Sequence, residues 1–165
     1  MLKLNDKNLY GFYDFENLSN FDNLNEFYCM KNELVGFKNI PEKLKLLNCA
    51  FNKIVSLDNI NSELETLICV GNLINKLNNL PTKLINLDCS YNKLTQLDYL
   101  PESLLILCCS HNQITKLDNL PNHLNILNCE SNKLTELNNL PSKLIQFKHS
   151  NNYGLKKIKI ISDKN

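Results

Sequence analysis

The chain has 165 residues, enough for one domain, and two residue types dominate it: leucine occurs 32 times and asparagine 29 times, whereas arginine and tryptophan are absent. The formal net charge is +1, and the longest run of like charge is the pair Lys156-Lys157. We therefore expect neither nucleic acid nor a membrane surface as partner, because both require a dense basic face. The longest strongly apolar run, 104–109, is far shorter than the roughly 20 residues of a membrane-spanning helix.

Residues 1–23 precede a regular repeat and are interpreted as an N-terminal cap, because the first coil of a stacked repeat would otherwise expose its core to water. The apolar side chains of this segment are Leu4, Leu9, Phe12, Phe15, Leu18 and Phe21. Charged residues between positions 3 and 16 interrupt any apolar core of a secretory signal. We therefore expect an intracellular protein, with the host cytoplasm as one alternative, and cysteines in the reduced state.

A period of 20 residues organises positions 24 to 154 into seven repeats. The first place of each repeat is a leucine: Leu24, Leu44, Leu64, Leu84, Leu104, Leu124 and Leu144. The sixth place is a cysteine in all but the last repeat: Cys29, Cys49, Cys69, Cys89, Cys109, Cys129, then His149. The ninth place is always asparagine: Asn32, Asn52, Asn72, Asn92, Asn112, Asn132 and Asn152. Proline follows the units at Pro41, Pro81, Pro101, Pro121 and Pro141, with Asn61 as the exception.

The spacing within one repeat predicts a short strand, a turn and a return leg. Leu87 and Cys89 alternate with polar residues, which is typical of a strand with one buried face. Asn92 follows at a turn, where its side chain can bind backbone groups. The return leg has an apolar residue at every third position and ends in proline, which favours an extended or 3₁₀ path. Each repeat is therefore one coil of a solenoid, stable only when stacked.

The pattern L-x-x-L-x-C-x-x-N-x-L-x-x-L-x-x-L-P resembles the leucine-rich repeat in its short 20-residue Leu-Pro subtype, as found in proteins of giant DNA viruses and in bacterial effectors. The composition lacks arginine and is rich in asparagine, lysine and isoleucine, which is typical of an AT-rich genome and fits the viral source. The resemblance implies a right-handed coil with a parallel β-sheet on its concave face, extended or 3₁₀ segments on its convex face, and binding of other proteins. The family most often has leucine where this chain has the cysteine column.

We expect a single leucine-rich repeat domain over residues 1–165, with an N-terminal cap (1–23), seven repeats (24–154) and a C-terminal cap (155–165). In the C-terminal cap, Ile158, Ile160 and Ile161 are interspersed with lysine, which indicates a final strand with a charged edge.

The cysteine column raises the alternatives of a metal site, disulfides and simple packing. Four sulfurs bind one zinc ion at about 2.3 Å, but four cysteines stacked at about 4.8 Å per coil span roughly 14 Å and cannot converge. Disulfides between neighbouring coils are closer to feasible, yet parallel side chains hold the Cβ atoms about 1 Å too far apart. We therefore expect buried thiols that pack as small hydrophobes, and neither metal nor cofactor.

The third, fifth, seventh and eighth places vary in identity and are expected to project from the concave sheet. Ile106, Ile126 and Cys108 should form a contiguous apolar island bordered by two rings, and exposed apolar patches often mark binding sites. The alternative is that isoleucine is simply a good strand former at a half-exposed place. The predicted partner-binding residues are Tyr91, Ile106, Cys108, His111, Ile126, Ile68 and Asp88.

Cys108, His111 and Asp88 are also the parts of a thiol hydrolase. Three residues of nearly extended chain should hold Cys108 and His111 roughly 7 to 10 Å apart, and no oxyanion-binding turn is evident. We predict no catalytic residue. The expected function is that of a non-enzymatic, monomeric module that binds an unidentified protein. The alternatives are a structural or virion-associated spacer, or a substrate-recognition arm for an enzyme on another chain.

Overall fold

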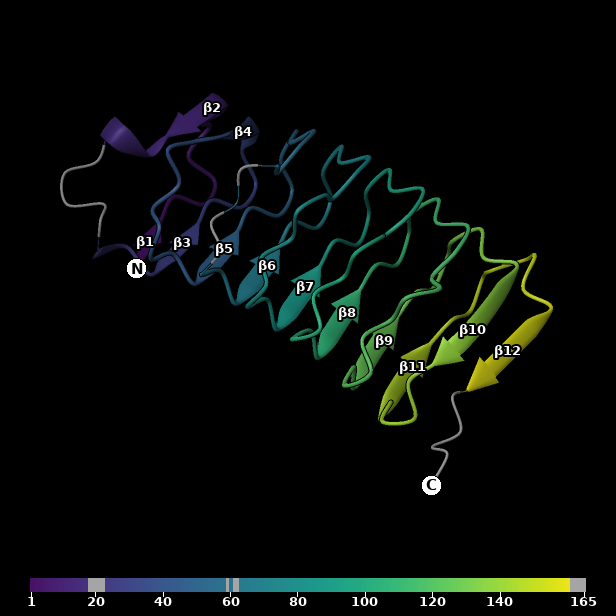
Figure 1. Ribbon diagram of the computed structural model, residues 1–165. Helices are drawn as coiled ribbons and strands as arrows, with labels where there is room; N and C mark the ends of the chain where they lie inside the picture. Colours follow the sequence, from purple (N-terminus) through teal and green to yellow (C-terminus); the bar gives the residue numbers. More distant parts are fainter. Residues whose placement is uncertain (18–22, 59, 61–62, 161–165) are drawn as a thin grey trace.

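The computed structural model describes residues 1–17, 23–58, 60 and 63–160 (Figure 1). They form the predicted solenoid, in which successive short strands lie side by side along the molecule. Four residues named above, Leu18, Phe21, Asn61 and Ile161, lie outside the described residues. No helix in the described part of the chain has the length and apolar character needed to cross a membrane.

One parallel sheet of eight strands runs the length of the molecule in the order β1-β3-β5-β6-β7-β8-β9-β11. Its strands are β1 (Leu2–Lys3), β3 (Glu26–Tyr28), β5 (Leu46–Asn48), β6 (Thr66–Ile68), β7 (Asn86–Asp88), β8 (Ile106–Cys108), β9 (Ile126–Asn128) and β11 (Gln146–Lys148). From β3 onward each residue pairs with the residue 20 positions later, as Leu67 does with Leu87. The sequence period is therefore also the register of the sheet.

Within the described residues, no 3₁₀ segment occurs in the return legs of the repeats, and return-leg strands are found at the two ends of the solenoid. At the N-terminal end β2 (Tyr10–Asp14) pairs with β4 (Glu33–Lys38), and at the C-terminal end β10 (Glu136–Leu140) pairs with β12 (Lys157–Ile160), both in parallel. The 3₁₀ segment η1 (Phe15–Asn17) belongs to the N-terminal region. The final strand expected near the C-terminus is β12.

The core is a stack of leucine and cysteine columns in which each coil adds the same set of side chains. Leu84, Leu87 and Cys89 have no exposed surface, and the corresponding residues of neighbouring coils are equally buried. At the N-terminal end the core changes to aromatic rings: Phe15 packs edge-on against Phe27 with ring centroids 4.9 Å apart. Residues 1–17 thus cover the first coil, and β1 adds a strand to its sheet.

The asparagine column joins each coil to the one before it. The Nδ2 of Asn92 donates to the carbonyl of Cys89 in its own coil and to that of Cys69 in the preceding coil, at 3.1 and 2.9 Å. Its Oδ1 accepts a hydrogen bond from the backbone N–H of Ile74 at 3.0 Å. Among the described residues, no buried side-chain nitrogen or oxygen lacks a partner. The predicted asparagine turn is confirmed.

Candidate partner-binding surface

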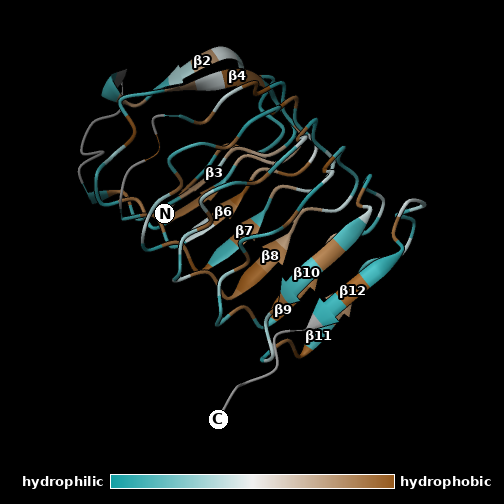
Figure 2. Ribbon diagram, turned by 45° about the vertical axis from the view of Figure 1, so that its right-hand side comes forward, coloured by the Kyte–Doolittle hydropathy of each residue, from teal (hydrophilic) through white to brown (hydrophobic). Residues whose placement is uncertain are grey.

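The outward side of the eight-stranded sheet, here called the sheet face, is built by the alternation of side chains along each short strand. The middle residue of each strand from β3 to β9 is buried, whereas its first residue is partly exposed. Figure 2 shows β8 as hydrophobic throughout, while the neighbouring β7 is partly hydrophilic. The apolar character of the sheet face is therefore concentrated on particular coils.

Ile106 and Ile126 are register partners on β8 and β9, so the structure brings this predicted pair together. Two further residues extend the patch. Ile85 is 40% exposed, and the backbone N–H of Leu105 donates to its carbonyl at 2.9 Å, so the two residues are neighbours where β7 and β8 begin. We call Ile85, Leu105, Ile106, Cys108 and Ile126 the apolar island. Sequence reasoning missed Ile85 and Leu105, although the variable identity of the second place could have indicated its exposure.

Asp88 separates Ile68 from the apolar island. Ile68 pairs with Asp88, which pairs with Cys108, so the carboxylate stands between the two apolar side chains. Its Oδ1 accepts a hydrogen bond from the backbone N–H of Ser90 at 3.1 Å. In their own coils, the side-chain oxygens of Asn48 and Asn128 likewise accept a hydrogen bond from the backbone N–H two residues later. The fifth place is therefore less free than the sequence suggested, because in three coils its side chain caps the end of the strand.

Cys108 is partly buried, and its surroundings disfavour the thiolate. Burial, and then the charge of Asp88, raise the pKa of this thiol, while Lys148 acts in the opposite direction. An activated nucleophile requires a lowered pKa. His111 is stacked on Tyr91, which occupies one face of its ring. The arrangement therefore gives no support to the hydrolase alternative.

Tyr91 and His111 form a parallel ring stack at the corner that follows the strands. Their centroids lie 4.1 Å apart and their planes are inclined by 10°. Both residues have a positive φ, 55° for Tyr91 and 53° for His111. The same left-handed conformation occurs at the eighth place of every repeat: Lys31, Phe51, Gly71, Tyr91, His111, Ser131 and Asn151. The eighth place is thus constrained by its backbone, whereas the sequence indicated a freely variable position.

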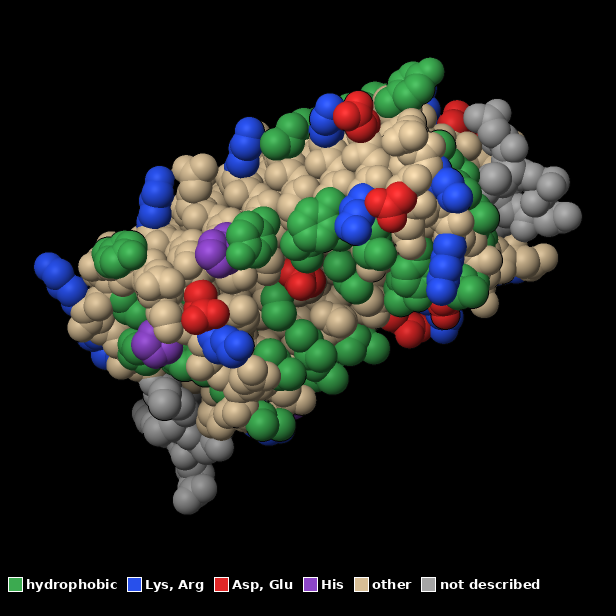
Figure 3. All heavy atoms as spheres, turned by 180° about the vertical axis from the view of Figure 1, so that it is seen from behind, with side chains coloured by type: hydrophobic (Ala, Val, Ile, Leu, Met, Phe, Trp, Pro, Cys, Tyr) green, Lys and Arg blue, Asp and Glu red, His purple; other side chains and the backbone are tan. Residues whose placement is uncertain are grey.

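Phe51 and Gly71 continue this corner towards the N-terminus. The Phe51 ring lies against Gly71, because a Cβ built on that glycine would approach the ring to 2.7 Å. Phe51 is 54% exposed and Tyr91 is 55% exposed. We call Phe51, Gly71, Tyr91 and His111 the aromatic row. The space-filling view of Figure 3 shows hydrophobic side chains in a broken row along the face that it presents. Phe51 was not among the predicted site residues.

The seventh place is buried in three of the middle coils and partly exposed at Val70 between them. Ala50, Ser90 and Ser110 are buried, contrary to the expectation that this place projects towards a partner. The chain turns towards its left-handed corner at the next residue, and this turns the small seventh side chain inward. In these three coils the variable surface is therefore narrower than the sequence indicated.

The cysteine column is buried as free thiols, as the packing interpretation predicts. Some thiols also donate to a carbonyl in the following coil: Cys89 Sγ lies 3.5 Å from the oxygen of Cys108, and Cys129 Sγ 3.5 Å from that of Lys148. Burial raises the pKa of Cys129 to about 12 and that of Cys89 well above its usual range. Within the described residues, no three histidine, cysteine or acidic side chains gather as a metal site would require.

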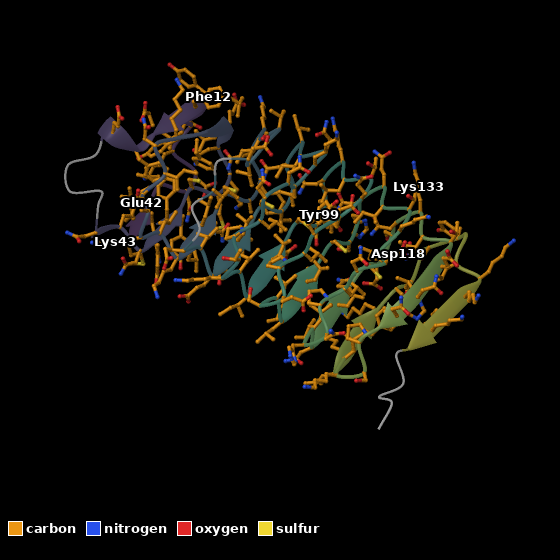
Figure 4. All side chains as sticks on the ribbon, in the orientation of Figure 1. Phe12, Glu42, Lys43, Tyr99, Asp118 and Lys133 are labelled. Carbon is orange, nitrogen blue, oxygen red and sulfur yellow. The ribbon has the colours of Figure 1, made fainter. Side chains whose placement is uncertain are left out.

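The return-leg side offers a small alternative site near the N-terminal end. A cavity of about 150 Å³ lies between the β2–β4 pair and the next return leg, lined by Phe12, Val35 and Val55 among others. Figure 4 labels Phe12 on this side of the molecule, together with Tyr99, Asp118 and Lys133 further along the return legs. Tyr99 is 92% exposed. This side contains none of the predicted partner-binding residues.

Comparison with protein-family models finds no match, and neither does comparison with curated proteins. Solved structures do match. YopM from Yersinia enterocolitica WA-314 is 30% identical with a TM-score of 0.75, covering 85% of this chain and 33% of its own. The leucine-rich repeat domain of a Shigella effector is 36% identical with a TM-score of 0.59, covering 60% and 45%. The functional domain of InlJ from Listeria monocytogenes, which includes a cysteine ladder, is 26% identical with a TM-score of 0.53, covering 81% and 41%.

The chain therefore spans about a third of YopM and under half of the other two chains. The three are bacterial, and the resemblance to bacterial effectors is supported. These three structures do not support a viral source, which stays a prediction.

Proposed function

The chain is a leucine-rich repeat protein of the short 20-residue subtype, and from this premise we propose that it is a non-enzymatic module whose sheet face binds a protein partner. The repeat fold and its neighbours support a protein-interaction module in general. The sheet face is the concave side of such a solenoid, and the seven predicted residues lie on it or at its corner.

The observation that carries this proposal is the apolar island next to the aromatic row. Binding energy at protein interfaces comes mainly from a few apolar or aromatic anchors ringed by polar contacts. Ile106, Ile126 and Tyr91 are such anchors, and the neighbouring places hold mostly asparagine and serine. A net charge of +1 and the lack of arginine favour a protein over a nucleic acid or a membrane.

The same proposal includes the state and location of the chain. A monomer is supported by β12, where lysines alternate with isoleucines and charge the terminal strand. An intracellular location, the host cytoplasm included, is supported by seven cysteines that are all free thiols. The raised pKa of Cys108 supports a non-enzymatic role, because the thiol stays protonated near neutral pH.

The test is a double variant of the sheet face, Ile106→Lys with Tyr91→Lys. A partner is first captured from cytosol with the wild-type chain and identified, and its Kd is then measured for each variant. Lysine fits the backbone at position 91, because Lys31 adopts the same conformation in the first repeat. Loss of two anchors should cost about 2 kcal/mol or more, roughly a 30-fold weaker Kd.

The matched control places two lysines on exposed return-leg positions, Gln96→Lys with Thr115→Lys. This control should bind normally, and both variants should keep the wild-type unfolding midpoint within a small margin. Normal binding by the sheet-face variant, together with loss of binding by the control, would show that the partner uses the return-leg side and that the proposal is wrong.

A further inference from the structure

Asp88 is the one formal charge at the centre of the sheet face. At the third, fifth, seventh and eighth places of the second to fifth repeats, every other residue is apolar, histidine or uncharged polar. The nearest coils carry Lys45 and Glu65 at the second place, but these two pair with each other at 2.8 Å. Asp88 forms no ion pair with any residue that the structure describes. The carboxylate of Asp88 therefore has no ion-pair partner in this part of the chain.

The carboxylate is held in a fixed position beside apolar surface. It is partly buried between Ile68 and Cys108, and the hydrogen bond from Ser90 fixes one of its oxygens. An ionised carboxylate offers about four acceptor sites, so most of its hydrogen-bonding capacity remains available. A partner that covers the apolar island must also cover Asp88. Burying a lone carboxylate is strongly unfavourable unless a cation comes with the partner.

Tyr91 indicates which cation fits. The backbone of Tyr91 donates to Ser110 in the next coil, and that of Gly71 donates to Ser90, so His111 and Gly71 lie on opposite sides of Tyr91. His111 covers one face of the Tyr91 ring. The other face is turned towards Gly71, which has no side chain of its own and against which the Phe51 ring lies. A planar guanidinium can stack on a tyrosine ring and bind a carboxylate with a directed pair of donors, whereas an ammonium is a compact point charge.

We propose that the partner presents an arginine, flanked by apolar residues, whose guanidinium pairs with Asp88 on the side of Tyr91 that faces away from His111. The apolar residues then cover Ile106 and Ile126, and the arginine removes the cost of covering the carboxylate. This inference rests on the proposed function, because it names the chemistry of the partner on the same face.

The experiment uses a phage-displayed library of random linear peptides, selected on the immobilised full chain. Selected peptides should be enriched in one arginine with apolar neighbours. A synthetic copy of the dominant peptide should bind Asp88→Asn about tenfold or more weakly than wild type, while Asp98→Asn, which removes a carboxylate from the exposed return leg, should bind it normally. Asparagine at position 88 can keep the bond to Ser90, as Asn48 and Asn128 do in their coils. Replacing the peptide arginine by lysine should also weaken binding.

The outcomes separate the two proposals. The selected peptides could fail to bind the double variant Ile106→Lys with Tyr91→Lys and yet show no enrichment in arginine, or bind Asp88→Asn as tightly as wild type. Either result would overturn the arginine inference and leave sheet-face binding in place. Equal binding by the lysine peptide would overturn it as well. A selection whose binders all tolerate the double variant, or one that yields no binder, would instead count against the sheet face as the binding surface.

Discussion

Asparagine serves at the ninth place because one small side chain carries both a donor and an acceptor. The amide group of Asn92 donates to carbonyls of its own coil and of the preceding coil, and its oxygen accepts from an N–H of the preceding coil. Aspartate would lack the donors, and serine would not reach both coils. The column therefore closes the backbone hydrogen bonds of each turn where water is excluded.

Asn92→Ala should lower the free energy of unfolding by about 1–3 kcal/mol, because it leaves the buried N–H of Ile74 without a partner. It also removes one of the two asparagine hydrogen bonds that each carbonyl of Cys69 and Cys89 accepts. Urea unfolding followed by circular dichroism measures the loss. Asn75→Ala, at an exposed position of the preceding return leg, is the control and should change stability little. If both variants were equally stable, the turn would have to draw its stability from another source.

Cys108 should be the first thiol to react in the folded chain. A thiol reagent should modify all seven cysteines of a denatured sample. In the native protein it should react mainly at Cys108, because the other six cysteines are buried and this one is partly exposed. Its raised pKa makes the reaction slow at neutral pH and faster as the pH rises. Asp88→Asn removes one cause of that shift and should speed the reaction at a fixed pH. A slower reaction in this variant would contradict the electrostatic contact between the two groups.

At the scale of the element, the structure of a coil could be predicted where buried positions repeat the same side-chain type every 20 residues. It could not be predicted where successive coils share only a backbone conformation. Leu87, Cys89 and Asn92 recur every 20 residues because each fills the same space in its coil, so the strand and its turn followed from the sequence. The corner after the strand has no such signal. Phe51, Gly71 and His111 share no side-chain type there, but all adopt a positive φ.

The same difference explains which parts of the candidate site were found. Ile106 and Ile126 were predicted because strand alternation places them outward. Ile85 and Leu105 were missed because they precede the strand, where alternation no longer applies. The stacking of Tyr91 on His111 depends on two corners that place their rings in the same direction, and the residue types alone do not indicate this.

The left-handed corner gives a prediction about Tyr91. Tyr91→Val should destabilise the chain by about 1–2 kcal/mol, because a β-branched residue is strongly disfavoured at a positive φ. Tyr91→Asn should be tolerated better, since Asn151 occupies the corresponding corner of the last repeat. Urea midpoints of the two variants provide the comparison, since both lose the ring stack. Equal midpoints would mean that the corner relaxes to another conformation.

At the scale of the whole molecule, the column of six buried cysteines makes the folded state less stable as the pH becomes alkaline. Burial raises the pKa of each column thiol in the folded state, to about 12 for Cys129. In the unfolded chain these thiols titrate near the ordinary value of 9.0. Their contribution is therefore fully present below about pH 9 and is lost as the pH rises towards the folded-state pKa.

We expect the free energy of unfolding to fall steeply from about pH 9 to 10. Each column cysteine contributes a slope of about 1.4 kcal/mol per pH unit, so six give an upper limit of roughly 8 kcal/mol per unit. Urea unfolding at a series of pH values, under reducing conditions, measures this slope. The double variant Cys69→Ala with Cys89→Ala should be less stable at pH 7 but show about two thirds of the slope. A slope unchanged by these substitutions would assign the alkaline loss to other groups.

The constant register also gives the gene a simple way to change length. Leu47 meets Leu67 just as Leu67 meets Leu87, so every coil presents the same joint to its neighbours. A duplication of 20 codons, starting at any point in the repeats, inserts one more coil and leaves all existing joints intact. A duplication of 19 or 21 codons would misalign a leucine column and an asparagine column at once. Unequal recombination can thus enlarge or shrink the binding surface in whole coils, and each product along the way is a folded protein.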